Sequence, residues 1–191
     1  MIKDLAKKSR SYRGYDESCA VTREQLEEMV DCTRYAPSSV NIQPLKYYLA
    51  NEKETVEKIQ ALTKWARALP ELNLPHPGHH PTAWIVICQD LRISDSVPRF
   101  QKDVGIAAQT ILLAAVEMGL GGCMIGNFNP KEIRLALNLP DTLMPVLLVA
   151  IGKPDETVVI REIDEGGDTA YYRDENGVHY VPKRKLKDIL L

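Results

Sequence analysis

Apolar positions recur with helical spacing in the first half of the chain. Thr22 and Gln25 form a capping box, and apolar or small residues follow at 26, 29, 30 and 33, which predicts a helix over 22–35 that Pro37 ends. A second amphipathic pattern, beginning near Val56, predicts a helix that reaches about residue 65. Asn129, followed by Pro130 and an acid at 132, predicts the start of a helix that reaches about residue 138.

Other segments are apolar on nearly every face. Residues 103–118 ("DVGIAAQTILLAAVEM") predict a central helix that protein encloses on all sides. Aromatic and β-branched runs predict strands over 46–50, 83–90, 144–152 and 157–163. Residues 69–81 hold four prolines and one glycine and should form a loop, and "DENG" (174–177) should form a turn.

Length and charge narrow the possible classes of protein. The 191 residues, 45% of them hydrophobic, suit one domain over 1–191, with an extension from about residue 155 that looks too extended to form its own core and is expected to pack on another subunit. The net charge of −2 gives no general attraction to nucleic acid or anionic membranes, so a bound anion needs a local cationic cluster. The first 16 residues lack the apolar core of a signal peptide, and we expect a soluble, cytoplasmic protein.

Cysteines and histidines offer little support for metal or hydrolytic chemistry. The four cysteines are widely spaced and form no CxxC pair, which indicates neither a zinc site nor a disulfide framework. A metal site at His76, His79 and His80 is a weaker alternative to solvated loop histidines, and we predict no metal. No GxSxG elbow is present, so a serine hydrolase is unsupported.

Three polar or glycine-rich segments are candidates for binding. "SRSYRGYD" (9–16) places Arg10 and Arg13 around Ser11, a pattern suited to phosphate, although two such arginines can also be merely solvated. "GLGGCMIGN" (119–127) can bring backbone close to a flat ligand or can simply cap a helix and turn; it follows a helix, which excludes a Rossmann fingerprint. "APSSVNIQP" (36–44) is either a linker or a stiff polar loop that binds a heterocycle.

Taken in order, these segments resemble the nitroreductase family of FMN-dependent oxidoreductases. The resemblance rests on "RSYRGYD", "YAPSSVNIQPLKYYLA", "DVGIAAQTILLAAVEMGLGGCMIG", "LMPVLLVAIGKP" and "VPKRKL". It implies an α+β fold in which helices flank a central, mostly antiparallel sheet. It also implies an intertwined homodimer with FMN at the interface and the C-terminal tail packed on the partner.

The resemblance assigns residues to the cofactor. It implies that the FMN phosphate and ribityl chain contact the N-terminal Arg10, Ser11 and Arg13 and the C-terminal Lys183 and Arg184, with Lys185 as an alternative. It places Pro37, Ser38, Ser39 and Asn41 against the flavin of the other subunit. The backbone bordering the isoalloxazine ring would be that of Gly121, Gly122, Ile125, Gly126 and Asn127, with the Asn127 N–H facing N5.

The implied activity is ping-pong transfer of hydride from NADH or NADPH, through flavin N5, to an electron-poor acceptor such as a nitroaromatic, quinone or enone. Because the cofactor supplies the chemistry, we assign no catalytic side chain. The alternative is an FMN-binding dimer without nitroreductase turnover, serving flavin storage, sensing or another flavin chemistry such as dehalogenation. Three departures stand out. Ser9 replaces a frequent arginine, which removes one cation from the phosphate site, and Leu45 replaces a frequent aromatic residue. Residues 65–82 match the family at no individual position, and we expect them to shape the substrate cavity.

Overall fold

A central five-stranded sheet organises the protein. The computed structural model describes residues 1–191. The strands are β1 (Tyr15–Asp16), β2 (Leu45–Ala50), β3 (Ala83–Asp90), β4 (Gly121–Ile125) and β5 (Leu143–Pro154). Their order is β1-β5-β3-β2, with β4 also paired to β5, and every pair is antiparallel. The predicted antiparallel central sheet is therefore confirmed.

The buried position of the middle strand β3 accounts for its apolar sequence. All eight of its residues are buried, and it pairs with β2 along one edge and β5 along the other. A strand covered on both faces needs apolar side chains at successive positions, which accounts for the run "AWIVIC".

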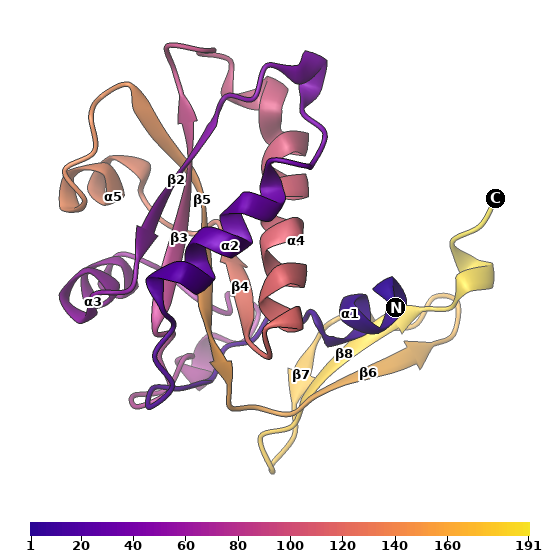
Figure 1. Ribbon diagram of the computed structural model, residues 1–191. Coiled ribbons are helices and arrows are strands. Elements are labelled where there is room, and N and C mark those ends of the chain that lie inside the picture. The colour runs from indigo at the N-terminus through magenta and orange to yellow at the C-terminus, as the bar shows by residue number, and fades with distance from the viewer.

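Helices cover the two faces of the sheet (Figure 1). Helices α2 (Arg23–Thr33) and α4 (Gln101–Glu117) build one core with inward residues such as Met29, Ile85 and Ile111. Helices α3 (Lys53–Ala61) and α5 (Pro130–Ala136) lie over the opposite face. There Ile59 and Ile133 join a second core that surrounds the buried Trp84.

Most predicted helix boundaries are confirmed. The Thr22 side chain and Gln25 make the reciprocal capping box of α2, and the Asn129 side chain caps α5. Helix α3 is shorter than predicted, because it ends at Ala61 and Thr63 instead forms a β-bridge to Phe128. That bridge ties the end of α3 to the segment that follows β4.

The prediction that α4 is enclosed on all sides is wrong for the single chain. Gly105, Ile106 and Gln109 form an open stripe along it, with Ile106 38% exposed. Apolar composition cannot distinguish burial within one chain from burial against a second chain, which is why the pattern misled. No helix of the protein combines the length and apolar character needed to cross a membrane.

The C-terminal segment forms a small second sheet beside helix α1 (Ile2–Lys8) (Figure 1). Its strands are β6 (Val158–Ile163), β7 (Tyr172–Arg173) and β8 (His179–Arg184), in the order β6-β8-β7. The predicted 174–177 turn is confirmed, because the Asp174 carboxylate accepts the N–H groups of Asn176 and Val178. His179 is the only buried residue between 155 and 191, so the segment has strands but no core of its own.

Short 3₁₀ turns complete the chain. They span Ser39–Asn41, Pro70–Leu72, Val97–Phe100 and Leu186–Asp188. The second of them interrupts the predicted proline-rich loop over 69–81, which otherwise lacks helices and strands.

Candidate functional site

The two ends of the chain meet at one cavity of about 340 Å³. The N-terminal segment contributes Arg10 and Arg13, and β8 contributes Lys183. Because side chains alternate along a strand, residues 179, 181 and 183 of β8 share the face that lines the cavity. The full lining is Ser9, Arg10, Ser11, Arg13, Gln109, Leu112, Met124, Tyr171, His179, Val181 and Lys183. We call this the phosphate cavity, since three cations converge on it and no carboxylate lines it.

Backbone contacts fix the N-terminal arginines at this cavity. Arg10 Nε donates to the Ser9 carbonyl at 2.7 Å and Nη2 donates to the Ala6 carbonyl at 2.9 Å, which leaves the remaining guanidinium N–H groups for a ligand. The Tyr12 N–H donates to the Gly122 carbonyl at 3.1 Å, and Ser11 bridges to the same residue of β4. The segment is therefore attached to the central sheet.

A buried ionic cluster lies behind Arg13. The Glu156 carboxylate accepts the Arg13 backbone N–H at 2.5 Å and also accepts the guanidinium of Arg173. Burial raises the pKa of Glu156, and these two partners oppose that rise. The Arg13 guanidinium lies 4.8 Å from the ring centroid of Tyr171, a cation–π distance that adds to its anchoring.

His179 is a site residue that the sequence analysis missed. It is 1% exposed, and its Nε2 lies 3.3 Å from Arg13 Nη1. Burial, together with the charges of Arg13 and Arg173, lowers the pKa of His179 to about 4, so the ring is neutral at pH 7 and Nε2 can accept from Arg13. Its Nδ1 is buried without a partner in the chain. The available sequence signal was that His179 lies four residues before Lys183, and therefore on the same face of a strand.

A second cavity of about 370 Å³ adjoins the first, because both are lined by Arg13, Met124 and Tyr171. We call it the ring cavity. The end of β4 brings the predicted Ile125, Gly126 and Asn127 to it. A Cβ built on Gly126 would meet nothing within 4 Å, so the backbone here is open to a ligand. The segment after α3 completes the lining with Lys64, Ala66 and Arg67.

Gly121 and Gly122, whose backbone the resemblance places beside the flavin ring, lie within strand β4. They line neither cavity and pair with β5 inside the sheet. A Cβ on Gly122 would lie 2.3 Å from the Ala150 carbonyl oxygen, and one on Gly121 would lie 2.6 Å from the Tyr12 ring. Close packing within the chain is therefore what requires these glycines.

Of the three predicted C-terminal cations, only one lines the phosphate cavity. Arg184 follows Lys183 on β8, so it falls on the opposite strand face and does not line the phosphate cavity. Lys185 Nζ lies 2.5 Å from Asp164 Oδ1 and is paired there. Of the three candidates, the structure brings only Lys183 to Arg10 and Arg13.

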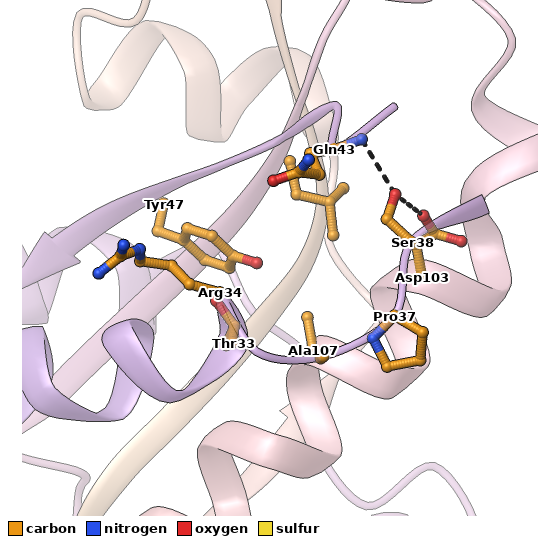
Figure 2. A pocket seen from close by; sticks show the side chains of 10 residues that line it. Thr33, Arg34, Pro37, Ser38, Gln43, Tyr47, Asp103 and Ala107 are labelled. Carbon is orange, nitrogen blue, oxygen red and sulfur yellow. Dashed lines mark hydrogen bonds between the residues drawn. The ribbon is translucent and has the colours of Figure 1, made fainter. Parts of the chain in front are cut away.

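The loop over 36–44 lies at a separate cavity of about 110 Å³, between the end of α2 and α4 (Figure 2). Pro37 and Ser38 line it, while Ser39 and Asn41 do not. Within one chain, none of these four residues lines the phosphate or ring cavity. The buried Asp103, which the sequence analysis also missed, holds the loop in place by accepting hydrogen bonds from it.

The backbone of this loop is strained. Val40, Asn41 and Gln43 have φ values of 53°, 56° and 53°, in the left-handed region that a β-branched residue such as Val40 rarely adopts. Such conformations persist only where surrounding contacts enforce them, and they concentrate at functional sites. The hydrogen bonds from Ser38 and Ser39 to Asp103 are contacts that can hold this loop in its strained conformation.

Two of the three loop histidines pair with separate acids. His79 Nδ1 lies 3.0 Å from Asp155 Oδ2, and His80 Nδ1 lies 3.1 Å from Glu17 Oε1. No group of three or more His, Cys, Asp or Glu side chains is arranged to hold a metal ion. The four cysteines are all free.

Comparisons with known proteins agree with this architecture. The chain is 31% identical to FMN reductase (NAD(P)H) of Bacillus subtilis over 76% of its own length and 62% of the relative's. It is 28% identical to the oxygen-insensitive NADPH nitroreductase of Helicobacter pylori, covering 79% of this chain and 86% of that one. The solved structure of an FMN-dependent nitroreductase from Clostridium difficile superposes with a TM-score of 0.65 at 27% identity, covering 82% and 88% of the two chains.

The sequence profile of the Nitroreductase family matches residues 6–153, from the end of α1 through nearly all of β5. That span contains the whole central sheet except the last residue of β5, together with four of the helices that cover it. The chain therefore belongs to the nitroreductase family.

Proposed function

We propose that the protein is an FMN-dependent oxidoreductase that passes reducing equivalents from NADH or NADPH to an electron-poor acceptor such as a nitroaromatic, quinone or enone. Family membership and the names of the relatives, an FMN reductase and NAD(P)H nitroreductases, support this proposal. FMN, when bound, would supply the hydride chemistry, and the side chains described above would hold and orient it.

The observation that carries the proposal is the convergence of Arg10, Arg13 and Lys183 on one cavity. A phosphate monoester carries about −1.5 to −2 charge at pH 7, so it needs several cations. Because its net charge is −2, the protein as a whole does not attract anions. The cations gathered from both chain ends therefore indicate a local anion-binding site. The donor set therefore fits a phosphate group, with Ser11 available as a further hydroxyl donor.

The ring cavity suits the flat part of the cofactor. Met124 and Ile125 provide an apolar surface that would exclude water, while the open backbone at Gly126 permits close approach. The N–H of Asn127 donates to no acceptor within the chain, so it is free to donate to a polar edge of the ring.

We propose a homodimer in which the loop over 36–44 completes the partner's site. Three observations support this arrangement: the loop is hydrogen-bonded to Asp103 but lies away from its own chain's phosphate cavity, α4 has an open stripe that exposes Ile106, and exposed apolar residues crowd the C-terminus. The last group is Leu186, Ile189, Leu190 and Leu191. Sedimentation should give twice the chain mass, whereas a stable holoprotein monomer would contradict a shared site.

The absorption spectrum of the purified protein tests the function. We expect flavin bands, release of FMN on denaturation, anaerobic bleaching by NADH or NADPH, and recovery of the bands on adding a nitroaromatic or quinone. A yellow protein that neither nicotinamide bleaches would favour FMN binding without turnover. A colourless protein that takes up no added FMN would refute the proposal.

A further inference from the structure

We propose that Lys64 and Arg67 make the ring cavity selective for a reactant that carries an anionic group, a carboxylate or a phosphate. This inference rests on the proposed function, because it concerns the reactants of the same site. It depends on how the segment 63–67 is held, on the charges that this segment presents, and on which cations the FMN phosphate does not require.

The segment is attached to the floor of the ring cavity. Thr63 bridges to Phe128, and the Lys64 N–H donates to the carbonyl of Asn127 at 3.0 Å. Trp65 packs edge-on against the buried Trp84, with ring centroids 5.7 Å apart, and its Nε1 donates to Thr63 Oγ1 at 3.0 Å. The backbone of Lys64 is therefore hydrogen-bonded to Asn127, the residue that we expect to border the flavin ring in this cavity.

The backbone of the segment 63–67 also bends tightly between Lys64 and Arg67. Ala66 has a φ of 43°, and its carbonyl accepts the Leu69 N–H at 2.7 Å. A non-glycine residue in the left-handed region costs energy, and such residues cluster at active sites and ligand clamps. This turn presents Lys64 and Arg67 to the same cavity.

Both cations are available to a ligand. Lys64 and Arg67 are exposed, and neither forms an ion pair, in contrast to Arg173 and Lys185, which pair with Glu156 and Asp164. No acidic residue lines the ring cavity. A concave surface lined by one sign of charge raises the local concentration of ligands of the opposite sign.

The cofactor phosphate does not require these two residues. The phosphate cavity has Arg10 and Lys183 as well as the shared Arg13, and neither Lys64 nor Arg67 lines it. Two further cations beside the ring are therefore in excess of what the FMN phosphate needs. The anion could be a carboxylate on the acceptor or the 2′-phosphate that distinguishes NADPH from NADH, and these share the same recognition chemistry.

Matched pairs of probes test the inference on the holoprotein. We would measure kcat/KM for 4-nitrobenzoate and its neutral analogue 4-nitrobenzamide, and for NADPH and NADH, in the parent and in the double variant Lys64→Gln/Arg67→Gln. Lys131→Gln, which removes an exposed charge that lines neither cavity, is the control. Binding of benzoate and benzamide by calorimetry gives a readout that does not depend on turnover.

We expect the double variant to lower the 4-nitrobenzoate-to-4-nitrobenzamide ratio or the NADPH-to-NADH ratio by about five- to tenfold, and 0.5 M NaCl to reduce the parent's preference toward the variant's. A fall confined to the nitrobenzoate ratio assigns the anion to the acceptor, and one confined to the NADPH ratio assigns it to the donor. Unchanged ratios in both pairs, with equal binding of benzoate and benzamide, would overturn the inference. Absence of FMN and of turnover in the parent would instead refute the proposed function, and the binding comparison would still test the cavity.

Discussion

Ser38 Oγ donates a 2.6 Å hydrogen bond to Oδ2 of the buried Asp103, which joins the loop after α2 to the first turn of α4 (Figure 2). The Ser39 N–H donates to the same oxygen at 2.9 Å, and the Gln43 N–H donates to Ser38 Oγ at 3.0 Å. Asp103 is well placed for this role, because the N-terminal end of a helix favours a negative charge. One carboxylate thus organises a loop whose backbone would otherwise relax.

Asp103→Ala should lower the free energy of unfolding by about 2–4 kcal/mol, because two partly buried donors lose a charged acceptor. Asp103→Asn keeps an acceptor oxygen and should lose less. Urea unfolding measures both changes. Asp95→Ala, at an exposed acid without an ion pair, should change stability by no more than about 0.5 kcal/mol. Equal losses for Asp103→Ala and Asp95→Ala would show that the loop does not depend on Asp103.

Lys183 and Arg184 should differ sharply in their contribution to FMN affinity. Lys183→Ala or Arg10→Ala should each weaken binding by roughly 1.5–3 kcal/mol, the size of a hydrogen bond to a charged group. Arg184→Ala removes the same charge from the opposite face of β8 and should have little effect. Fluorescence titration of the apoprotein with FMN measures all three. A larger loss at Arg184 than at Lys183 would mean that the strand face is assigned incorrectly.

Ile106→Lys tests the proposed dimer. Ile106 lies on the open stripe of α4 and is 38% exposed in the single chain, and a lysine buried there against a partner would lose its hydration. We expect the dimer dissociation constant to rise by at least about 100-fold, with weaker FMN binding as the shared site separates. Ile93→Lys, at a position that is 45% exposed and outside the stripe, is the matched control. Sedimentation that shows an unchanged dimer for Ile106→Lys would place the interface elsewhere.

His179 should make stability depend on pH below neutrality. Its folded pKa of about 4 lies below the ordinary value of 6.5, so between pH 6.5 and 4 the unfolded chain binds a proton that the folded protein does not. The free energy of unfolding therefore falls as the pH is lowered through this window. Urea unfolding at pH 7 and pH 5 should show a smaller decline for His179→Asn than for the parent. Identical declines would mean that His179 is not held neutral by burial.

Local patterns in the sequence were sufficient for much of the fold. Capping residues located the starts of α2 and α5, and the uninterrupted apolar run located β3. Where longer-range pairing decides the structure, the patterns were insufficient. Helix α3 stops early because Thr63 pairs with Phe128, and β7 and β8 depend on pairing with each other and with β6 more than on a continuous apolar pattern.

The same distinction applies to the site: residues marked by a sequence pattern could be predicted, and residues defined by long-range contacts could not. Arg10, Arg13 and Lys183 could be proposed from charge and order along the chain, and the structure brings them to one cavity. Gly121 and Gly122 could not be separated from Gly126, which lines the ring cavity, because only the paired strand β5 reveals that their small size serves internal packing. Asp103 gave no signal of its own and His179 gave only the strand alternation that it shares with Lys183, since their importance lies in partners 64 or more positions away in the sequence.

The central claim is that the cavity formed by the two chain ends binds the phosphate of FMN. The most direct test is to compare the affinities of the apoprotein for FMN and for riboflavin, which differ only in that phosphate. With at least two charge-assisted hydrogen bonds from Arg10, Arg13 and Lys183, FMN should bind at least about 100-fold more tightly, and the advantage should shrink in Lys183→Ala. Equal affinities for FMN and riboflavin would contradict the account.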